Sequence, residues 1–206
     1  MKHLSPCKTT LYCILIGLLA PLPLLAIDAT AAHGDTHAHK DFSLYDQDGN
    51  LVTLSDLQGK FVVLEWINPD CPFVKRHYQA DTMTMAKLAQ AYKDKGVVWL
   101  SINSTHYFTQ EKNKAWHQEK KLTHQILDDH TGKVGRLFGA KTTPHLFILD
   151  QSGHKVYEGA IDSFSRGQDP ASVTNYVQAV LDDLLAKKDL RYQKTKSYGC
   201  SVKYAK

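Results

Sequence analysis

The run KFVVLEWIN (60–68) most constrains the fold of this chain, because it is almost continuously apolar and rich in β-branched and aromatic residues. Such a run is typical of a strand that is covered on both faces in the middle of a sheet. A second run of the same kind, VVWLSINS (97–104), follows a segment with helical spacing of its apolar residues. Crossovers of this type are right-handed, so we expect the two strands to be parallel neighbours.

Strand-like and helix-like segments alternate along the rest of the chain. Further strands are expected at 41–54 (a hairpin), 124–129, 141–150 and 155–162. Helices are expected at 72–95, 109–122, 132–139 and 170–187, with a helical turn at 55–59. Asp70 is the predicted cap of the first helix, Pro72 fits its first turn, and Thr109 caps the second. This order predicts an α/β fold with a mixed central sheet, helices on both faces, and an antiparallel hairpin, 145–160, at one edge.

The N-terminal residues indicate the compartment. Two lysines precede an apolar core at 11–26 that is broken by two prolines and followed by several alanines. This layout is typical of a secretory signal peptide, and the core is short for a membrane span. We therefore expect a signal peptide at 1–31, cleaved after Ala31, and an exported protein, periplasmic or extracellular. An uncleaved anchor is the alternative, and it is the only membrane association that the sequence suggests.

A histidine-rich lead-in at 32–40 is expected to precede the folded domain at 41–187. His33, His37 and His39 could hold copper or zinc, but on a flexible lead-in they would bind weakly, so we expect no resident metal. The chain carries 25 basic and 21 acidic residues and has no long basic block with interleaved aromatic residues. It therefore offers no footprint for a nucleic acid.

Cysteine usage points to redox chemistry. Of the four cysteines, Cys71 and Cys200 lie outside the predicted signal peptide. Cys71 is placed at a strand-to-helix turn, where free backbone N–H groups and the helix dipole favour the thiolate. Lys75 and Arg76 add positive charge, whereas Asp70 opposes ionisation. A thiol in such a place can have a pKa of roughly 3.5–7.5 instead of about 8.5, and an inert buried cysteine is the alternative.

The chain resembles the thioredoxin-like superfamily over residues 41–187. The resemblance rests on the strand that runs into Cys71-Pro72, on the segment TTPHLFILD (142–150), and on the hairpin followed by a last helix. Within the superfamily it is similar to the alkyl hydroperoxide reductase/thiol-specific antioxidant (AhpC/TSA, redoxin) branch, and NPDCPFVKRHY and GCSVKY are similar to exported members. The resemblance implies a three-layer fold, and it implies a cis-proline, Pro144 after Thr143, that faces the active cysteine.

Two departures from the superfamily narrow the chemistry. Val74 stands where a thioredoxin-type Cys-x-x-Cys has its second cysteine, so a self-contained dithiol is excluded. Peroxiredoxins carry a proline and a threonine where this chain has Leu64 and Asn68. The absent threonine favours disulfide exchange over peroxide reduction, whereas the redoxin branch favours peroxide.

The leading hypothesis is an exported thiol-disulfide oxidoreductase without a bound cofactor. Cys71 is the expected nucleophile, and Cys200, in a flexible polar tail at 188–206, is its expected resolving partner. At about 3.3–3.6 Å per extended residue, the tail is long enough to return to Cys71. A permanent structural disulfide and an intermolecular link remain open. The expected partners are a protein or small-molecule disulfide or a peroxide, together with an external thiol reductant.

Three alternatives accompany this hypothesis. One is a peroxiredoxin-like antioxidant peroxidase, and another is a copper-binding module in which His77 or His145 joins the two cysteines. A non-catalytic partner protein with one disulfide is the third. Glu65, in the central strand, is a further candidate: if buried it must be paired or protonated, and a raised pKa would suit proton transfer near sulfur. An outward orientation or a contact with Lys or Arg would explain it equally well.

Overall fold

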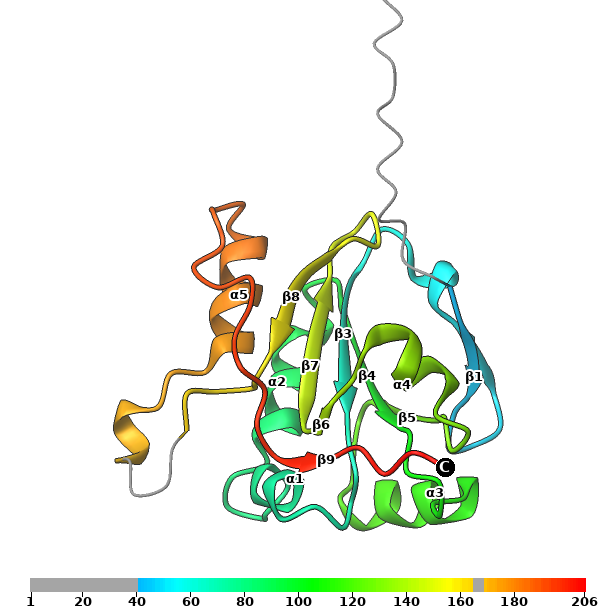
Figure 1. The fold of residues 1–206 in the computed structure, drawn as a ribbon. Coiled ribbons are helices and arrows are strands. Elements are labelled where there is room, and N and C mark those ends of the chain that lie inside the picture. The colour runs from blue at the N-terminus through cyan, green and yellow to red at the C-terminus, as the bar shows by residue number, and fades with distance from the viewer. Residues whose placement is uncertain (1–40, 165–168) are drawn as a thin grey trace, which may run out of the picture. The chain divides into compact units, whose positions relative to one another are not determined.

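A five-stranded mixed sheet forms the centre of the computed structural model, which describes residues 41–164 and 169–206. Its strand order is β5-β4-β3-β7-β8 (Figure 1). The central β3 (Phe61–Trp66) pairs in parallel with β4 (Val97–Asn103), which pairs in parallel with β5 (Gln125–Asp128). The antiparallel strands β7 (His145–Leu149) and β8 (Lys155–Gly159) complete the other side. The predicted mixed sheet and edge hairpin are confirmed.

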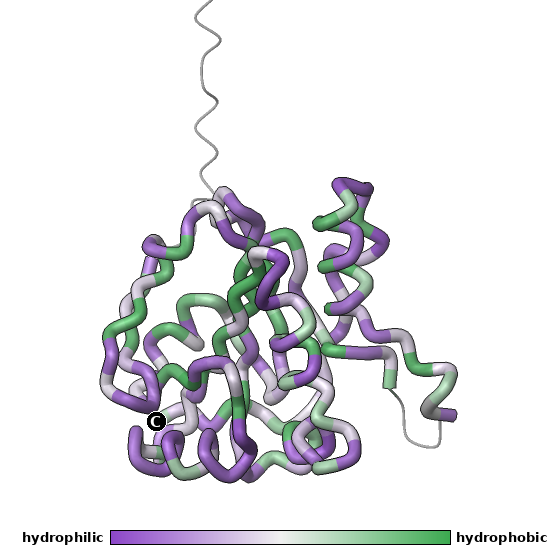
Figure 2. The backbone as a smooth tube through the Cα atoms, turned by 180° about the vertical axis from the view of Figure 1, so that it is seen from behind, coloured by the Kyte–Doolittle hydropathy of each residue, from purple (hydrophilic) through white to green (hydrophobic). Residues whose placement is uncertain are grey.

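The two faces of the sheet are covered by different elements. Apolar residues of α2 (Thr84–Lys93) and α5 (Tyr176–Leu185), with Trp116 of α3 (Gln110–Glu119), pack on one face. The other face is covered by α4 (Lys133–Phe138), the 3₁₀ turn η1 (Leu54–Leu57) and the hairpin of β1 (Ser43–Tyr45) and β2 (Leu51–Thr53). Figure 2 shows the most hydrophobic stretches in the central strands, which is the distribution expected when both faces of a sheet are covered.

The helix predicted at 72–95 is two helices. The first, α1, spans Pro72–His77, and the backbone then leaves the helical path until Met83, which has a φ of 43° immediately before α2. The Thr82 hydroxyl donates to the Arg76 carbonyl oxygen at 2.8 Å, so a side chain takes over a carbonyl group at the end of α1. The apolar residues keep a nearly helical spacing across both helices, so the sequence pattern does not reveal the interruption.

The predicted cap at Asp70 is wrong. The N-cap position belongs to Cys71, whose side chain makes no capping hydrogen bond, while the Asp70 N–H donates to Asn68 Oδ1 at 2.8 Å. Pro72 does occupy the first turn, as predicted. The N-cap position of α1 is therefore occupied by the reactive cysteine and not by a capping carboxylate.

The last helix is also shorter than predicted. A 3₁₀ turn, η2 (Pro170–Ser172), precedes α5, which begins only after Asn175. The Asn175 side chain accepts from the Gln178 N–H at 2.9 Å, which is a normal cap. The inner residues Val177 and Val180 are buried as expected.

The C-terminal tail, predicted to be a flexible segment, packs against the domain. Its short strand β9 (Cys200–Ser201) pairs antiparallel with β6 (Thr142–Thr143), so that Cys200 lies opposite Thr143. On one side of β9, the Thr195 N–H donates to the Glu158 carbonyl oxygen at 3.0 Å, and on the other the Val202 N–H donates to the Lys141 carbonyl oxygen at 3.1 Å. In Figure 1 the red tail runs past α5 and β8 and then across the end of the sheet.

The predicted signal peptide and the lead-in histidines lie outside the described residues. Within residues 41–164 and 169–206, no helix has the length and apolar character needed to cross a membrane.

Candidate redox site

The two cysteines predicted to react lie in contact. The Sγ atoms of Cys71 and Cys200 are 2.7 Å apart, and both residues are free thiols. Cys71 follows the carboxyl end of β3 and is only 2% exposed, whereas Cys200 is half-buried on β9. The peptide bond between Thr143 and Pro144 is cis, as predicted, and the Thr143 carbonyl oxygen lies 3.0 Å from the Cys71 sulfur. Residues from three distant parts of the sequence thus meet at one sulfur atom.

The surroundings give the two thiols different acidities. Burial alone would raise the pKa of Cys71, but hydrogen bonds outweigh it and the pKa is lowered. The strongest of these comes from the Cys200 thiol, and the N–H groups of Val74 and Cys200 add to it. Burial and the contact with Cys71 raise the pKa of Cys200 to about 11. Of the two thiols, Cys71 therefore loses its proton first, while Cys200 keeps its proton and donates it to the Cys71 thiolate.

This difference predicts that Cys200→Ala and Cys200→Ser affect Cys71 differently. The serine hydroxyl still donates a hydrogen bond to the Cys71 thiolate, whereas alanine does not. We expect the midpoint of Cys71 alkylation by iodoacetamide, measured against pH, to lie about one unit higher in Cys200→Ala than in Cys200→Ser. Equal midpoints would contradict the role of Cys200 as the main hydrogen-bond donor.

The charged residues that follow Cys71 have other contacts. The Arg76 guanidinium lies 3.9 Å from Asp162 Oδ2 and stacks 3.3 Å over the Phe164 ring. His77 is buried, which lowers its pKa to about 4, so it carries no charge at neutral pH. Hydrogen bonds, rather than the charges of Lys75 and Arg76, are the main causes of the lowered pKa of Cys71.

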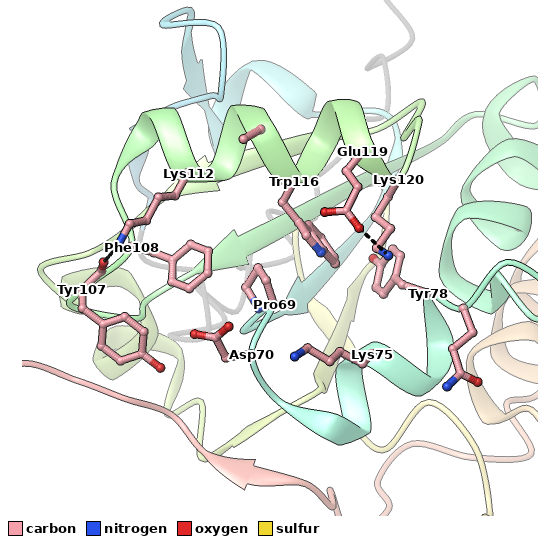
Figure 3. Close-up of a pocket in the computed structure, with 12 residues that line it drawn as sticks. Pro69, Asp70, Lys75, Tyr78, Tyr107, Phe108, Lys112, Trp116, Glu119 and Lys120 are labelled. Atoms are coloured by element: carbon pink, nitrogen blue, oxygen red, sulfur yellow. Dashed lines mark hydrogen bonds and ion pairs between the residues drawn. The ribbon is translucent and has the colours of Figure 1, made fainter.

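Asp70 and Lys75 instead line a pocket of about 690 Å³ beside α1. Figure 3 shows both side chains pointing into the space below α3. The remaining walls are largely aromatic and basic, and they include Tyr78, Tyr107, Phe108, Lys112, Trp116 and Lys120. This pocket adjoins the loop that carries Cys71, since Pro69 and Asp70 form part of its wall.

Glu65 is fully buried on the same side of β3 as Val63 and Ile67, which belong to the apolar cluster that includes Cys71. Its carboxyl group accepts from the Tyr78 hydroxyl at 2.9 Å, the Trp99 indole N–H at 2.8 Å and the Ser101 hydroxyl at 3.2 Å. Burial outweighs these hydrogen bonds and raises its pKa to about 7. The alternative of an outward-facing glutamate is therefore wrong, and the contact with Lys or Arg is not found among the residues that bond it.

No metal site is present within the described parts of the chain, where no three His, Cys, Asp or Glu side chains gather closely enough to hold an ion. The two histidines considered for copper are engaged elsewhere: His77 Nε2 lies 3.0 Å from the Tyr198 hydroxyl, and His145 Nδ1 accepts from the Lys141 N–H at 3.2 Å. His33, His37 and His39 lie outside the described residues.

Local sequence patterns do not indicate which residues hold the tail in place. Tyr198 donates a hydrogen bond to Asp162 at 2.5 Å, and the Thr195 hydroxyl contacts Tyr157 and the Ala160 N–H at 2.6 and 2.9 Å. These partners are far apart in the sequence, so no local pattern connects them. Gly199, directly before Cys200, was the one available signal, because glycine allows a close backbone approach.

Comparisons with known proteins agree with this geometry. The sequence pattern described as the AhpC/TSA family matches residues 36–157. A hypothetical protein from Sinorhizobium meliloti 1021 is 30% identical, with a TM-score of 0.72 over 82% of this chain and 93% of its own. An uncharacterized conserved protein from Geobacillus kaustophilus is 31% identical, with a TM-score of 0.73 over 82% and 90%.

The fold extends to more distant proteins. Peroxidoxin BcpB from Mycobacterium tuberculosis has a TM-score of 0.50 at 20% identity, over 72% of this chain and 92% of its own. None of the curated proteins matches the chain at a significant level. The matched pattern, the fold and the cysteine beside a cis-proline together show that this chain belongs to the AhpC/TSA family of thioredoxin-like redox proteins.

Proposed function

We propose that this protein is an exported thiol-disulfide oxidoreductase in which Cys71 attacks the substrate and Cys200 resolves the product. The observation that carries the proposal is the 2.7 Å contact between the two sulfur atoms, in which Cys71 has the lowered pKa. The second cysteine of a Cys-x-x-Cys motif is replaced by a thiol from the tail. Export rests on the signal-like N-terminal sequence alone.

The proposed reaction conserves two electrons at each step. The Cys71 thiolate attacks one sulfur of a disulfide substrate, which releases the other sulfur as a thiolate. Cys200 then loses its proton and attacks Cys71 in the mixed disulfide, which releases the reduced substrate and leaves a Cys71–Cys200 disulfide. An external thiol reductant restores both thiols. In the opposite direction the same disulfide would oxidise a dithiol substrate.

The substrate must pass the tail to reach Cys71. Because that thiol is 2% exposed and lies beneath Cys200, the segment around β9 has to lift locally before attack. The pocket beside Asp70 and Lys75 offers an adjoining surface with aromatic walls and a basic rim. It fits an extended, partly apolar polypeptide segment with acidic groups.

Peroxide is the second substrate class, because family membership supports it and a thiolate at Cys71 is suited to attack an O–O bond. The thiolate would take one peroxide oxygen and become a sulfenic acid, while the other oxygen leaves as water or an alcohol. Cys200 would then attack the sulfenic acid, which forms the disulfide and releases water. Asn68, at the position of the peroxiredoxin threonine, accepts from the Asp70 N–H with Oδ1 and donates to Tyr107 at 3.4 Å. Both ends of the Asn68 amide are thus used in hydrogen bonds within the protein and not directed at a peroxide, which favours disulfide exchange.

Oxidised glutathione tests the proposed roles. We expect the reduced protein to form the Cys71–Cys200 disulfide, and Cys200→Ser to stop at a mixed disulfide on Cys71, both identified by peptide mass mapping. Cys71→Ser should react at least about tenfold more slowly, because burial still raises the pKa of the remaining thiol. Equal reactivity of Cys71→Ser would refute the assignment, and much faster oxidation by hydrogen peroxide than by the disulfide would favour a peroxidase.

A further inference from the structure

Tyr198 lies two residues before Cys200 and connects the tail to α1, the helix that Cys71 caps. Its hydroxyl donates to Asp162 Oδ1 at 2.5 Å and accepts from the Nε2–H of His77 at 3.0 Å. We propose that Tyr198 is a positioning residue that sets the reduction potential of the Cys71–Cys200 pair by holding the Cys200 thiol against Cys71. This inference rests on the proposed function, in which the two cysteines form a reversible disulfide.

The contacts of Tyr198 span the whole of α1. Its ring packs against Phe73, the second residue of the helix, with ring centroids 5.9 Å apart, and its hydroxyl contacts His77, the last residue. Cys71 is the N-cap of the same helix. The tail is therefore held against the one element that also fixes the nucleophile, so the relative position of the two sulfur atoms depends directly on this contact.

The site that receives the hydroxyl is itself fixed. Asp162 is 6% exposed and also accepts from the Phe164 N–H at 3.1 Å, and Arg76 lies 3.9 Å from its other carboxylate oxygen. His77 is 2% exposed. A hydroxyl shared between a buried carboxylate and a buried imidazole has one preferred position, so it restricts the tail more than a surface contact would.

Only Gly199 separates Tyr198 from Cys200, and its backbone conformation is restricted. Gly199 has a φ of 127°, and a Cβ there would collide with the carbonyl group of Thr143. The backbone at Gly199 is consequently in close contact with Thr143, and the next residue, Cys200, pairs with Thr143. A displacement of Tyr198 is thus transmitted to the Cys200 sulfur.

Holding the tail matters more in the reduced protein than in the oxidised one. In the oxidised protein the disulfide itself keeps Cys200 beside Cys71, whereas in the reduced protein noncovalent contacts alone do so. Their strength sets the effective concentration of the Cys200 thiol, and this concentration determines how readily the disulfide closes. Weakening the contact therefore favours the dithiol and raises the reduction potential.

The variant Tyr198→Phe keeps the ring and its packing on Phe73 but removes the hydroxyl. We equilibrate wild-type and variant proteins with reduced and oxidised glutathione, quench the thiols with iodoacetamide, and quantify the Cys71–Cys200 disulfide by mass spectrometry. The equilibrium constant for disulfide formation should fall about tenfold, which for two electrons is a rise of about 30 mV. Thermal unfolding of both reduced proteins checks that the variant folds.

Two controls separate positioning from general damage to the tail. Tyr192→Phe changes another tail tyrosine, whose ring packs on that of Tyr176 with centroids 4.7 Å apart. Its hydroxyl makes no hydrogen bond within the described residues. The equilibrium constant for disulfide formation in this variant should match that of the wild type. In a Cys200→Ser background, Tyr198→Phe should leave the limiting alkylation rate of Cys71 at alkaline pH within about threefold, since the other tail anchors remain.

The outcomes distinguish this inference from the proposed function. A constant for Tyr198→Phe within about twofold of the wild type, or an equal fall in Tyr192→Phe, would overturn the positioning role while leaving the redox pair intact. If the wild-type protein forms no intramolecular disulfide in any glutathione buffer, the proposed function itself fails, and the positioning role fails with it.

Discussion

A chain that ends at Tyr192 is expected to react at Cys71 with iodoacetamide at least about a hundredfold faster than the intact chain, compared at an alkaline pH where Cys71 is fully ionised. The truncation removes β9, which pairs with Thr143 over the thiol, and the anchors at Thr195 and Tyr198. Each lost hydrogen bond contributes about 1 kcal/mol to keeping the tail closed, so the three bonds of Thr195, Tyr198 and Val202 together account for about a hundredfold protection.

The matched control is Cys200→Ser in the intact chain, which removes the second thiol but leaves the tail in place. Comparing limiting rates at alkaline pH separates access from acidity, because the truncation also removes the hydrogen bond from Cys200 that lowers the pKa of Cys71. We also expect the truncated protein to be less stable by about 3 kcal/mol in urea denaturation. Equal alkylation rates in the two proteins would show that the tail does not cover the thiol.

The parts of the fold that could be predicted are those with strong local patterns. The apolar run at 60–68 identifies the central strand, since only a strand covered on both faces tolerates so many consecutive apolar residues. Cys71 and Pro72 at the end of this run mark the strand-to-helix turn. The cis-proline after Thr143 followed from the resemblance to thioredoxin-like proteins and is confirmed.

The parts that could not be predicted depend on contacts between distant segments. The apolar spacing of α1 and α2 is nearly continuous, so the break at Met83 leaves no periodic signal. The tail looks flexible because it is polar, yet it is held mainly by hydrogen bonds to buried partners such as Asp162 and Tyr157. A polar tail that pairs with a short strand such as β6 has the same composition as one that does not, so the sequence alone predicts a flexible segment around Cys200.

The candidate site shows the same division. Cys71, Thr143 and Pro144 could be named from the sequence because each occupies a recognisable motif. Glu65 could be noticed as a charge in an apolar strand, but its hydrogen-bond donors come from two other segments: Tyr78 at the end of α1, and Trp99 and Ser101 on β4. Their arrangement determines whether the carboxyl group is ionised, and it becomes visible only in the folded protein.

The burial of Glu65 predicts an unusual dependence of stability on pH. The folded protein holds the Glu65 proton with a pKa of about 7, raised by burial, from an ordinary value of 4.5. The stabilising contribution of the protonated form is complete below about pH 4.5 and is lost as the pH rises to about 7. Over this interval the free energy of unfolding should fall by about 3 kcal/mol relative to a protein without the ionisable group.

The variant Glu65→Gln provides that reference, because its neutral amide has nearly the same shape. Urea denaturation at pH 5 and at pH 8 should show that the stability of Glu65→Gln relative to the wild type increases by about 3 kcal/mol at the higher pH. Any constant offset from changed hydrogen bonds to Tyr78 or Trp99 cancels in this difference. If the relative stability is the same at both pH values, Glu65 does not change its protonation in the folded protein between them. It is then either already ionised at pH 5 or still protonated at pH 8.

Glu158→Gln serves as a control of opposite sign. Hydrogen bonding and charge from Lys155, helped by Lys194, outweigh burial and lower the pKa of Glu158. Its ionised form stabilises the folded protein above the ordinary pKa and loses this effect in acid, so Glu158→Gln should be less stable than the wild type at neutral pH and equal to it in acid. If the stability relative to the wild type rises with pH in Glu65→Gln and falls with pH in Glu158→Gln, then ionisation of the buried Glu65 limits the stability of this protein near neutral pH. Glu65 lies in the same apolar layer as the reactive thiol of Cys71.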